Sequence, residues 1–327
     1  MNNIWTILKK VCEIKRGERI TTKLLTNNGY PVMSGGISNM GYYDKYNRNE
    51  NTITIAQYGT AGFVNWISEK FWANDVCYCL FPDNSKIMNK FLYYFLKSKQ
   101  QYIYNDVIKA NPPYYPLNSL ESFPITIIEM KTQQHIVNTI GSVDDLIEII
   151  SKINKKIDEY LEIKFSNLKA SNTLLKDVCD IKHGKFFQLS KLNFNLKYPI
   201  YGSNGIVATS DTYMFKESKI KISRVGDAGN VKLTSSFCNI SDNCLYLNLK
   251  NYKITLPLFY YLRNKIKCLS SGSVQPLITS KNISTLKIPD FNNIFFDSTK
   301  YIDLINVNNK KIQYLKKIKE FLLNKFF

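Results

Sequence analysis

Short runs of β-branched and aromatic residues, separated by Gly, Asn and Asp, recur along the chain. Such runs are typical of strands, whereas apolar residues in steps of three and four are typical of helices. Strands are predicted at residues 52–56, 76–81, 219–223 and 244–249, and short helices at 91–97 and 258–264. The pattern therefore favours an α+β fold built from mixed domains.

Two longer segments, 143–168 and 302–326, carry apolar residues in the stripe of a coiled-coil-like helix. The apolar positions expected at the interfaces of these helices are Ile147, Ile150, Ile157, Leu161, Ile305, Ile312, Leu315 and Leu322. An alternative is that each helix packs only against its own domain, since apolar stripes at helical spacing usually belong to a core.

An internal repeat organises these elements. The segment LKKVCEIKRG at 8–17 matches LKDVCDIKHG at 175–184 in seven of ten positions, at an offset of 167. The same offset relates Gly-Thr-Ala-Gly at 59–62 to Gly-Asp-Ala-Gly at 226–229. A long-period repeat dictates the architecture. The predicted order is a domain at 1–128, a helix at 129–170, a second domain at 171–293 and a second helix at 294–327.

The charges of the two helical segments differ in sign. Residues 142–168 contain six acidic residues and four lysines, whereas residues 300–327 contain seven lysines and two acidic residues. Opposite charge favours pairing of the two helices with each other. An antiparallel pair would relate the halves by a pseudo-twofold axis.

The net charge of +18 points to a polyanionic partner, most simply nucleic acid. Only five of the 44 basic residues are arginine, a bias that an AT-rich genome produces without selection for DNA binding. Residues 168–327 carry 25 basic and 10 acidic residues, against 19 and 16 in residues 1–167. We therefore expect the second half to supply more of any non-specific affinity for DNA.

Other classes of protein fit the sequence less well. It contains no apolar run of membrane-spanning length, so a cytoplasmic protein is expected. Seven cysteines without a CxxC pair suggest free thiols in a reducing compartment. With only two histidines, no metal site is expected.

Four motifs occur in both halves of the chain, and their shared order and spacing resemble those of the specificity subunits of type I restriction-modification systems. They are the LKxVCxIKxG opening, a Tyr-Pro-Val/Ile strand before a Gly/Ser turn, Gly-x-Ala-Gly, and the Asn-Lys-Lys-Ile at 154–157 and 309–312. The resemblance covers essentially the whole chain. It implies two target-recognition domains, similar in fold to those of adenine-N6 methyltransferases, separated by two spacer helices.

The resemblance also implies what the chain does and with which partners. The chain would be a non-catalytic reader of a bipartite, asymmetric target in double-stranded DNA, without a cofactor of its own. Two modification (methyltransferase) subunits would carry the S-adenosylmethionine chemistry. Restriction subunits would supply translocase and nuclease activities.

Sequence-specific binding needs basic residues at phosphates and polar side chains at base edges. Candidates for phosphate contacts follow the first strand of each domain: Lys15, Arg16, Arg19 and Lys23, then Lys182, His183 and Lys185. Readers of bases should lie on loops that differ between the halves: Asn39, Tyr42, Tyr43, Gln57, Tyr58 and Thr60, then Asn204, Thr209, Ser210, Arg224 and Asp227. A solvated basic face is the alternative for the first group. The tyrosine pairs at 93–94 and 260–261 are expected in the core.

One motif argues for an enzyme. Asn111-Pro112-Pro113-Tyr114 is the tetrapeptide with which amino-methyltransferases hold a flipped adenine. However, no G-x-G cofactor loop follows a predicted strand, and the repeat has Val-Gln-Pro-Leu at 274–277. We therefore assign no catalytic residue. A methyltransferase fragment and a DNA-binding scaffold outside restriction remain the alternatives.

Overall fold

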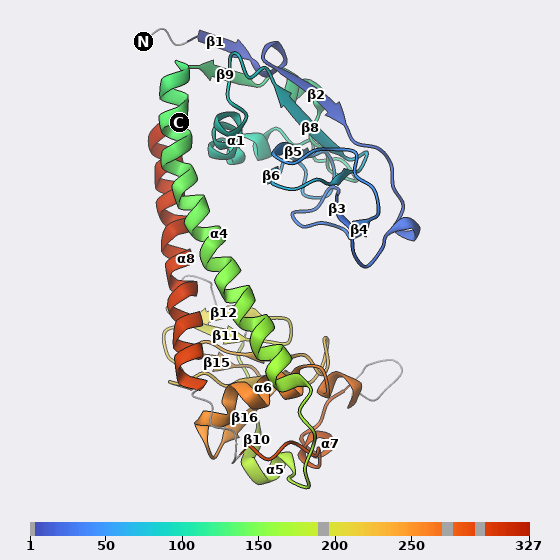
Figure 1. Ribbon diagram of the computed structural model, residues 1–327, viewed down its shortest axis with the longest axis vertical. Helices are drawn as coiled ribbons and strands as arrows, with labels where there is room; N and C mark the ends of the chain where they lie inside the picture. Colours follow the sequence, from blue (N-terminus) through green and yellow to red (C-terminus); the bar gives the residue numbers. More distant parts are fainter. Residues whose placement is uncertain (1–3, 189–195, 270–276, 292–297) are drawn as a thin grey trace. The chain divides into compact units, whose positions relative to one another are not determined.

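The computed structural model describes residues 4–188, 196–269, 277–291 and 298–327. Its internal contacts divide the chain into two units. Unit 1 comprises Met1–Glu148 and Gln313–Phe327, and unit 2 comprises Ile149–Ile312. Each unit therefore contains one copy of the repeat together with part of both long helices (Figure 1).

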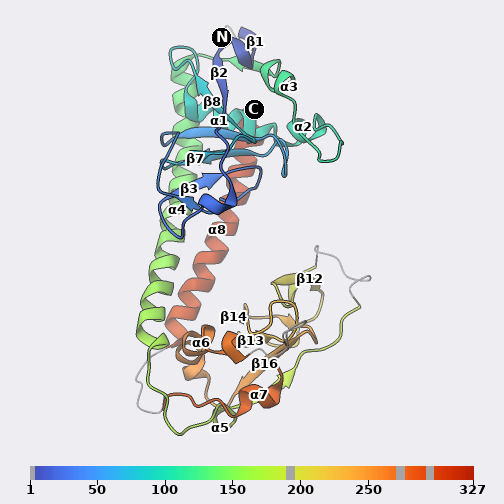
Figure 2. The ribbon, with the colours of Figure 1, turned by 90° about the vertical axis from the view of Figure 1, so that its right-hand side faces the viewer.

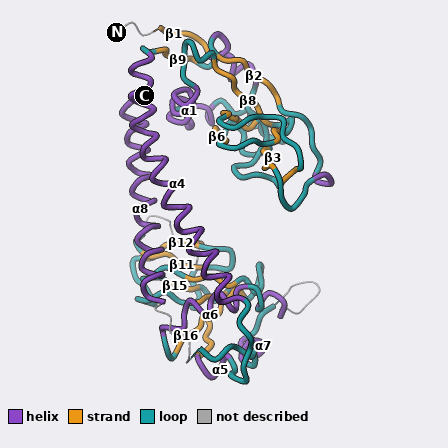
Figure 3. Tube along the Cα trace, in the orientation of Figure 1, coloured by secondary structure: helices purple, strands orange, loops and turns teal. Residues whose placement is uncertain are grey.

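Unit 1 contains an antiparallel four-stranded sheet in the order β2-β8-β5-β6 and a three-stranded sheet in the order β4-β3-β7. The first is built from β2 (Cys12–Arg16), β8 (Cys77–Pro82), β5 (Thr52–Ala56) and β6 (Val64–Ile67). The second is built from β4 (Tyr42–Tyr43), β3 (Tyr30–Met33) and β7 (Trp72–Ala73). A separate pair joins β1 (Ile4–Ile7) to β9 (Pro124–Ile127). Long loops separate most of these strands (Figure 3).

Three short helices complete this repeat: α1 (Asn89–Ser98), α2 (Gln100–Asn105) and α3 (Leu117–Glu121). Strand β5 is buried along its whole length, so it lies in the middle of the core. Helix α1 buries six consecutive residues, including Tyr93 and Tyr94, in the same cluster. The prediction that this tyrosine pair belongs to the core is confirmed.

Unit 2 repeats the arrangement. Its sheets have the orders β10-β16-β13-β14 and β12-β11-β15, in which each strand takes the place of its counterpart. The strands are β10 (Cys179–His183), β16 (Cys244–Leu249), β13 (Ile220–Ser223), β14 (Val231–Leu233), β12 (Ile206–Ser210), β11 (Tyr198–Tyr201) and β15 (Asn239–Ile240). The helices are α5 (Leu175–Val178), α6 (Thr255–Arg263) and α7 (Ser280–Ser284). The predicted repeat is thus a structural repeat, and its second tyrosine pair is buried as well.

Glycines explain why the repeated motifs are shared. A Cβ atom on Gly17 or on Gly184 would lie 2.2 Å from a backbone carbonyl oxygen, so no side chain fits where β2 and β10 end. The first and last glycines of Gly-x-Ala-Gly have φ between +73° and +84° in both repeats. Residues with a Cβ rarely adopt this left-handed conformation.

The two long helices are α4 (Met130–Ser166) and α8 (Ser298–Phe326). In unit 1, Lys319 Nζ lies 2.6 Å from Asp144 Oδ1. In unit 2, the Asn154 side chain donates to Asn309 at 3.1 Å and accepts from Asn308 at 2.8 Å. From Asp144 to Asn154 the residue number on α4 rises by ten, whereas the number of the partner on α8 falls by ten, from Lys319 to Asn309. Within each unit the two helices lie side by side and run in opposite directions (Figures 1 and 2).

Acidic residues of α4 also bind residues of the short helices in each repeat. Asp158 and Glu162 both pair with Arg263 of α6, at 3.0 and 3.4 Å. Asp158 also accepts a hydrogen bond from Tyr260, and Asp144 accepts one from Tyr94. Part of the negative charge of α4 therefore anchors the repeats to the helix.

Several smaller predictions concern the described residues. Six cysteines are buried free thiols, and burial raises the pKa of both Cys12 and Cys179 to about 12. No cluster of His, Cys, Asp and Glu that could hold a metal ion occurs in this part of the chain. Likewise, none of the described helices combines the length and apolarity that a bilayer crossing requires. The Val274-Gln275-Pro276 part of the sequence partner of 111–114 lies outside the described residues.

Candidate nucleic-acid interface

In unit 1 the structure brings together two residues that the sequence placed in different groups. Arg16 lies at the end of β2, and its guanidinium donates to Gln57 Oε1 at 2.5 Å. The same guanidinium lies over the Tyr78 ring, 5.7 Å from its centroid. Burial raises the pKa of Tyr78, so this phenol stays neutral beside the arginine. Arg16 is exposed, whereas Gln57 is only 6% exposed, so Gln57 orients the cation.

Two turns meet next to this pair. The Thr60 backbone N–H donates to the Gly35 carbonyl at 2.7 Å. A Cβ on Gly35 would lie 2.3 Å from the Tyr58 carbonyl oxygen, and one on Gly59 would lie 2.6 Å from the Gly35 oxygen. The two glycines therefore allow the turn after β3 to pack directly on the turn after β5.

A third loop joins them. The bridge between Ile108 and Tyr114 closes the 108–114 loop, which in Figure 2 projects beside α2 (Gln100–Asn105). Tyr114 also forms a bridge with Tyr58, and the two rings lie 5.9 Å apart. The next residue, Tyr115, donates its backbone N–H to the Gln57 carbonyl at 2.8 Å. Three loops thus share one edge of unit 1, formed by the turns at 34–38 and 57–60 and by the 108–114 loop.

The remaining predicted residues of unit 1 lie around this edge in different ways. Lys15 forms an ion pair with Glu13 at 3.0 Å, whereas Arg19 and Lys23 are exposed. Asn39 is partly buried in the turn after β3. Tyr42 and Tyr43 lie on β4 in the three-stranded sheet, where the Tyr43 ring packs edge-on against Trp72 at 5.1 Å.

Arg48 was not among the predicted residues. Its guanidinium donates to the backbone carbonyl of Arg16 at 2.6 Å and lies 3.8 Å from a Glu18 carboxylate oxygen. It therefore fixes the backbone that carries Arg16. An arginine 32 positions away in a loop gives no local signal of this contact.

In unit 2 a buried lysine holds the corresponding turn. The Lys221 side chain is fully buried on β13, and its ammonium donates to the carbonyls of Gly202 and Ser203 at 2.7 Å each. It also donates to Ser223 Oγ at 3.0 Å, and burial lowers its pKa. The position equivalent to Lys221 at the offset of 167 is Thr54, so the two repeats support their turns differently.

Some of the predicted residues of unit 2 are exposed, and the others are buried or hydrogen-bonded within the unit. Lys182, His183, Lys185 and Asn204 are exposed. Arg224 donates to the Asp242 carbonyl, Asp227 accepts from Asn230, Ser210 is buried, and Thr209 Oγ1 accepts from Leu196. Arg224 corresponds to Gln57, because Ile278 donates to its carbonyl at 3.0 Å just as Tyr115 does to that of Gln57.

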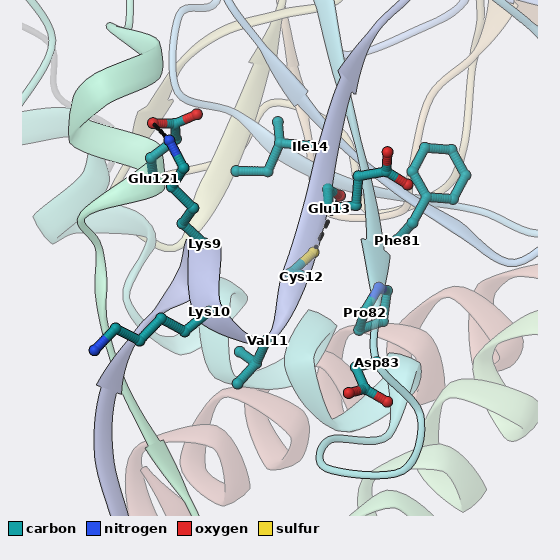
Figure 4. A pocket seen from close by; sticks show the side chains of 10 residues that line it. All are labelled: Lys9, Lys10, Val11, Cys12, Glu13, Ile14, Phe81, Pro82, Asp83 and Glu121. Atoms are coloured by element: carbon teal, nitrogen blue, oxygen red, sulfur yellow. Dashed lines mark hydrogen bonds and ion pairs between the residues drawn. The ribbon is translucent and has the colours of Figure 1, made fainter.

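The opposite end of β2 borders a cavity of about 500 Å³ (Figure 4). Its lining includes Lys9, Lys10, Glu13, Asp83 and Glu121. Lys9 pairs with Glu121 at 2.8 Å, so one of its two lysines is already neutralised. A mixed lining of this kind suits a polyanion less well than a wholly basic surface would.

The long helices carry two kinds of apolar position. Of the eight predicted interface residues, Leu161 is buried and the other seven are partly buried. A second set is exposed in each unit: Leu146, Tyr314, Ile318 and Phe321 in unit 1, and Ile149, Ile153, Tyr160, Ile163, Leu304 and Val307 in unit 2. In unit 2, Ile149, Ile153 and Tyr160 line an apolar groove of about 430 Å³ together with Tyr301.

Comparisons with known proteins agree with this organisation. Residues 6–159 and 171–289 each match the family model described as type I restriction modification DNA specificity domain. The chain is 28% identical over 320 residues to a protein of Mycoplasma genitalium described as a type I specificity subunit, covering 88% of this chain and 83% of that protein. A protein of Mycoplasma pneumoniae with the same description is 26% identical, covering 88% and 85%.

A solved structure supports the fold. The crystal structure of a type I restriction-modification system S subunit from M. genitalium has a TM-score of 0.56 and 24% sequence identity. The match covers 100% of this chain and 96% of that one.

Proposed function

Because the chain belongs to the family of type I restriction-modification DNA specificity domains and contains that domain twice, we propose that each repeat reads one half of a bipartite target in double-stranded DNA. A member of this family is the DNA-recognition subunit and not the catalytic one. The methyltransferase alternative based on residues 111–114 is therefore not favoured.

One observation carries the proposal: equivalent positions on a shared framework hold unlike side chains. Gln57 corresponds to Arg224, Arg16 to His183 and Thr54 to Lys221. In repeat 1 the buried Gln57 orients the exposed Arg16, whereas repeat 2 has the exposed His183 at the position of Arg16, so the two repeats would present different polar groups to DNA. The target is accordingly asymmetric.

We assign the exposed basic residues to the phosphates. Arg16 in repeat 1 and Lys182 and His183 in repeat 2 lie at the end of β2 and β10. The other exposed basic residues follow these strands: Arg19, Lys23 and Lys185. Contacts of this kind fix the register of a protein on the duplex without reading its sequence.

We assign the long helices to two tasks. The partly buried stripe pairs α4 with α8 as antiparallel spacer helices, and the exposed stripe receives helices of two modification subunits. Exposed apolar side chains repeated along a helix are costly unless a partner covers them. These subunits would carry S-adenosylmethionine, and this chain would need no cofactor. Restriction subunits would join the same assembly.

The experiment is an exchange of one repeat. The chain is expressed with its modification subunits, residues 175–290 are replaced by the same region of a relative, and modified adenines are mapped across the genome. We expect only one half of the methylated motif to change. A change in both halves, or in neither, would contradict the assignment of one reader to each repeat.

A further inference from the structure

We propose that the 108–114 loop is an additional reading element of repeat 1, in which Asn111 contacts a base edge and Lys109 contacts a phosphate of double-stranded DNA. The proposal rests on the function proposed above and adds a segment that otherwise resembles a catalytic motif.

The first argument is position. Tyr114 bridges to Tyr58, and Tyr115 is hydrogen-bonded to Gln57, so the loop is attached to two predicted readers by backbone contacts. Both hydrogen bonds between Ile108 and Tyr114 are present, at 2.9 and 3.1 Å. DNA that reaches Arg16 and Tyr58 would therefore meet this loop as well.

The second argument is availability. Residues 108–113 are all exposed, and within the described part of the chain neither Lys109 nor Asn111 has a side-chain hydrogen-bond partner. Two prolines follow Asn111, and proline fixes its own φ while restricting the residue before it. The loop thus presents a free amide on a stiff backbone, which lowers the entropy lost on binding.

The third argument is chemistry. An asparagine amide can donate and accept at once, and it pairs in bidentate fashion with the N7 and N6 of adenine in the major groove. A lysine beside it neutralises a phosphate. The sequence partner at 274–277 is Val-Gln-Pro-Leu, so the segment differs between the repeats as readers must.

The test uses the chain in complex with its modification subunits, on duplexes carrying the mapped motif and every single-base change in it. Asn111→Ala should abolish discrimination at one position of the half-site read by repeat 1, with affinity falling about 5- to 150-fold. Lys109→Ala should weaken binding to all duplexes and reduce the slope of log affinity against log salt by about one.

Matched controls are Asn118→Ala and Lys10→Ala. Lys10 lines the cavity at the other end of β2, and Asn118 lies in α3, which contributes Glu121 to that cavity. Both controls should leave the base preferences unchanged. Discrimination at the other half-site should persist in every variant and serves as the internal check on folding.

Two outcomes would overturn the inference. One is unchanged discrimination in Asn111→Ala. The other is normal sequence-specific binding with loss of methylation alone, which would mark Asn111 as part of a catalytic site. If the unaltered complex shows no sequence preference at all, the proposed function itself fails.

Discussion

Lengthening both long helices should lengthen the unread gap in the target. Asp144 pairs with Lys319 in unit 1 and Asn154 pairs with Asn309 in unit 2, so position 150 of α4 and position 312 of α8 each lie between the two pairs along their helix. A heptad inserted after Ile150 must therefore be matched by one inserted after Ile312. The inserted heptads then face each other, and both observed pairs are retained with their apolar stripes.

The size of the effect follows from helix geometry. Seven residues add about 10 Å of helix at 1.5 Å per residue. At about 3.4 Å per base pair, this corresponds to roughly three base pairs. Mapping of methylated adenines should show unchanged half-sites with a gap about three base pairs longer.

A matched control places the second heptad after Ile305 instead. Its length is the same, but Asn154 then faces inserted residues rather than Asn308 and Asn309. Asparagine side chains that pair across a helix interface specify the register of the helices, so this control should modify DNA more weakly. Half-sites at the original spacing with full modification in the matched variant would refute the idea that these helices measure the distance.

Three further outcomes are expected. In unit 1, the partly buried ion pair between Asp144 and Lys319 should stabilise the fold by about 1 kcal/mol of coupling energy. Urea unfolding of Asp144→Asn, Lys319→Met and the double mutant measures this coupling, and additive effects of the two mutations would exclude it. Burial lowers the pKa of Lys90 to about 8, so the folded state binds fewer protons than the unfolded state above pH 8. Resistance to urea should therefore rise from pH 8 to 9.5, less steeply in Lys90→Met; an equal slope would disprove this contribution. Lys221→Met should relax base preference at one half-site only, measured on the same duplexes, and an equal loss at both would indicate general unfolding.

Local patterns predicted the framework well. The strands at 52–56 and 244–249 match to the residue, the strand at 219–223 begins one residue later, and the strand at 76–81 is shifted by one residue at both ends. Three of them contain two or more β-branched or aromatic residues, and the fourth, at 244–249, is an apolar run with one tyrosine. The two-residue strands β4, β7 and β15 are too short for any periodicity, so the three-stranded sheets could not be predicted.

Contacts between residues far apart in the chain could not be predicted from the sequence. Arg16 and Gln57 are 41 positions apart, and β1 pairs with β9 across more than 110 residues. The opposite charges of the two helical segments predicted that α4 pairs with α8, and in unit 1 Lys319 of α8 does pair with Asp144 of α4. The same reasoning missed that Asp158 and Glu162 bind Arg263, because net charge does not identify the partner of an individual carboxylate.

The distribution of constraints within each repeat explains how one framework can serve two sequences. At Gly17 and Gly184 any side chain would collide with a backbone oxygen, so these two positions are restricted to glycine. Gln57 and Arg224, by contrast, receive the same backbone hydrogen bond whatever their side chains are. Their side chains have different partners, Arg16 for Gln57 and the Asp242 carbonyl for Arg224, yet the sheets of the two repeats have the same strand order. A change of target sequence would therefore begin at positions such as these.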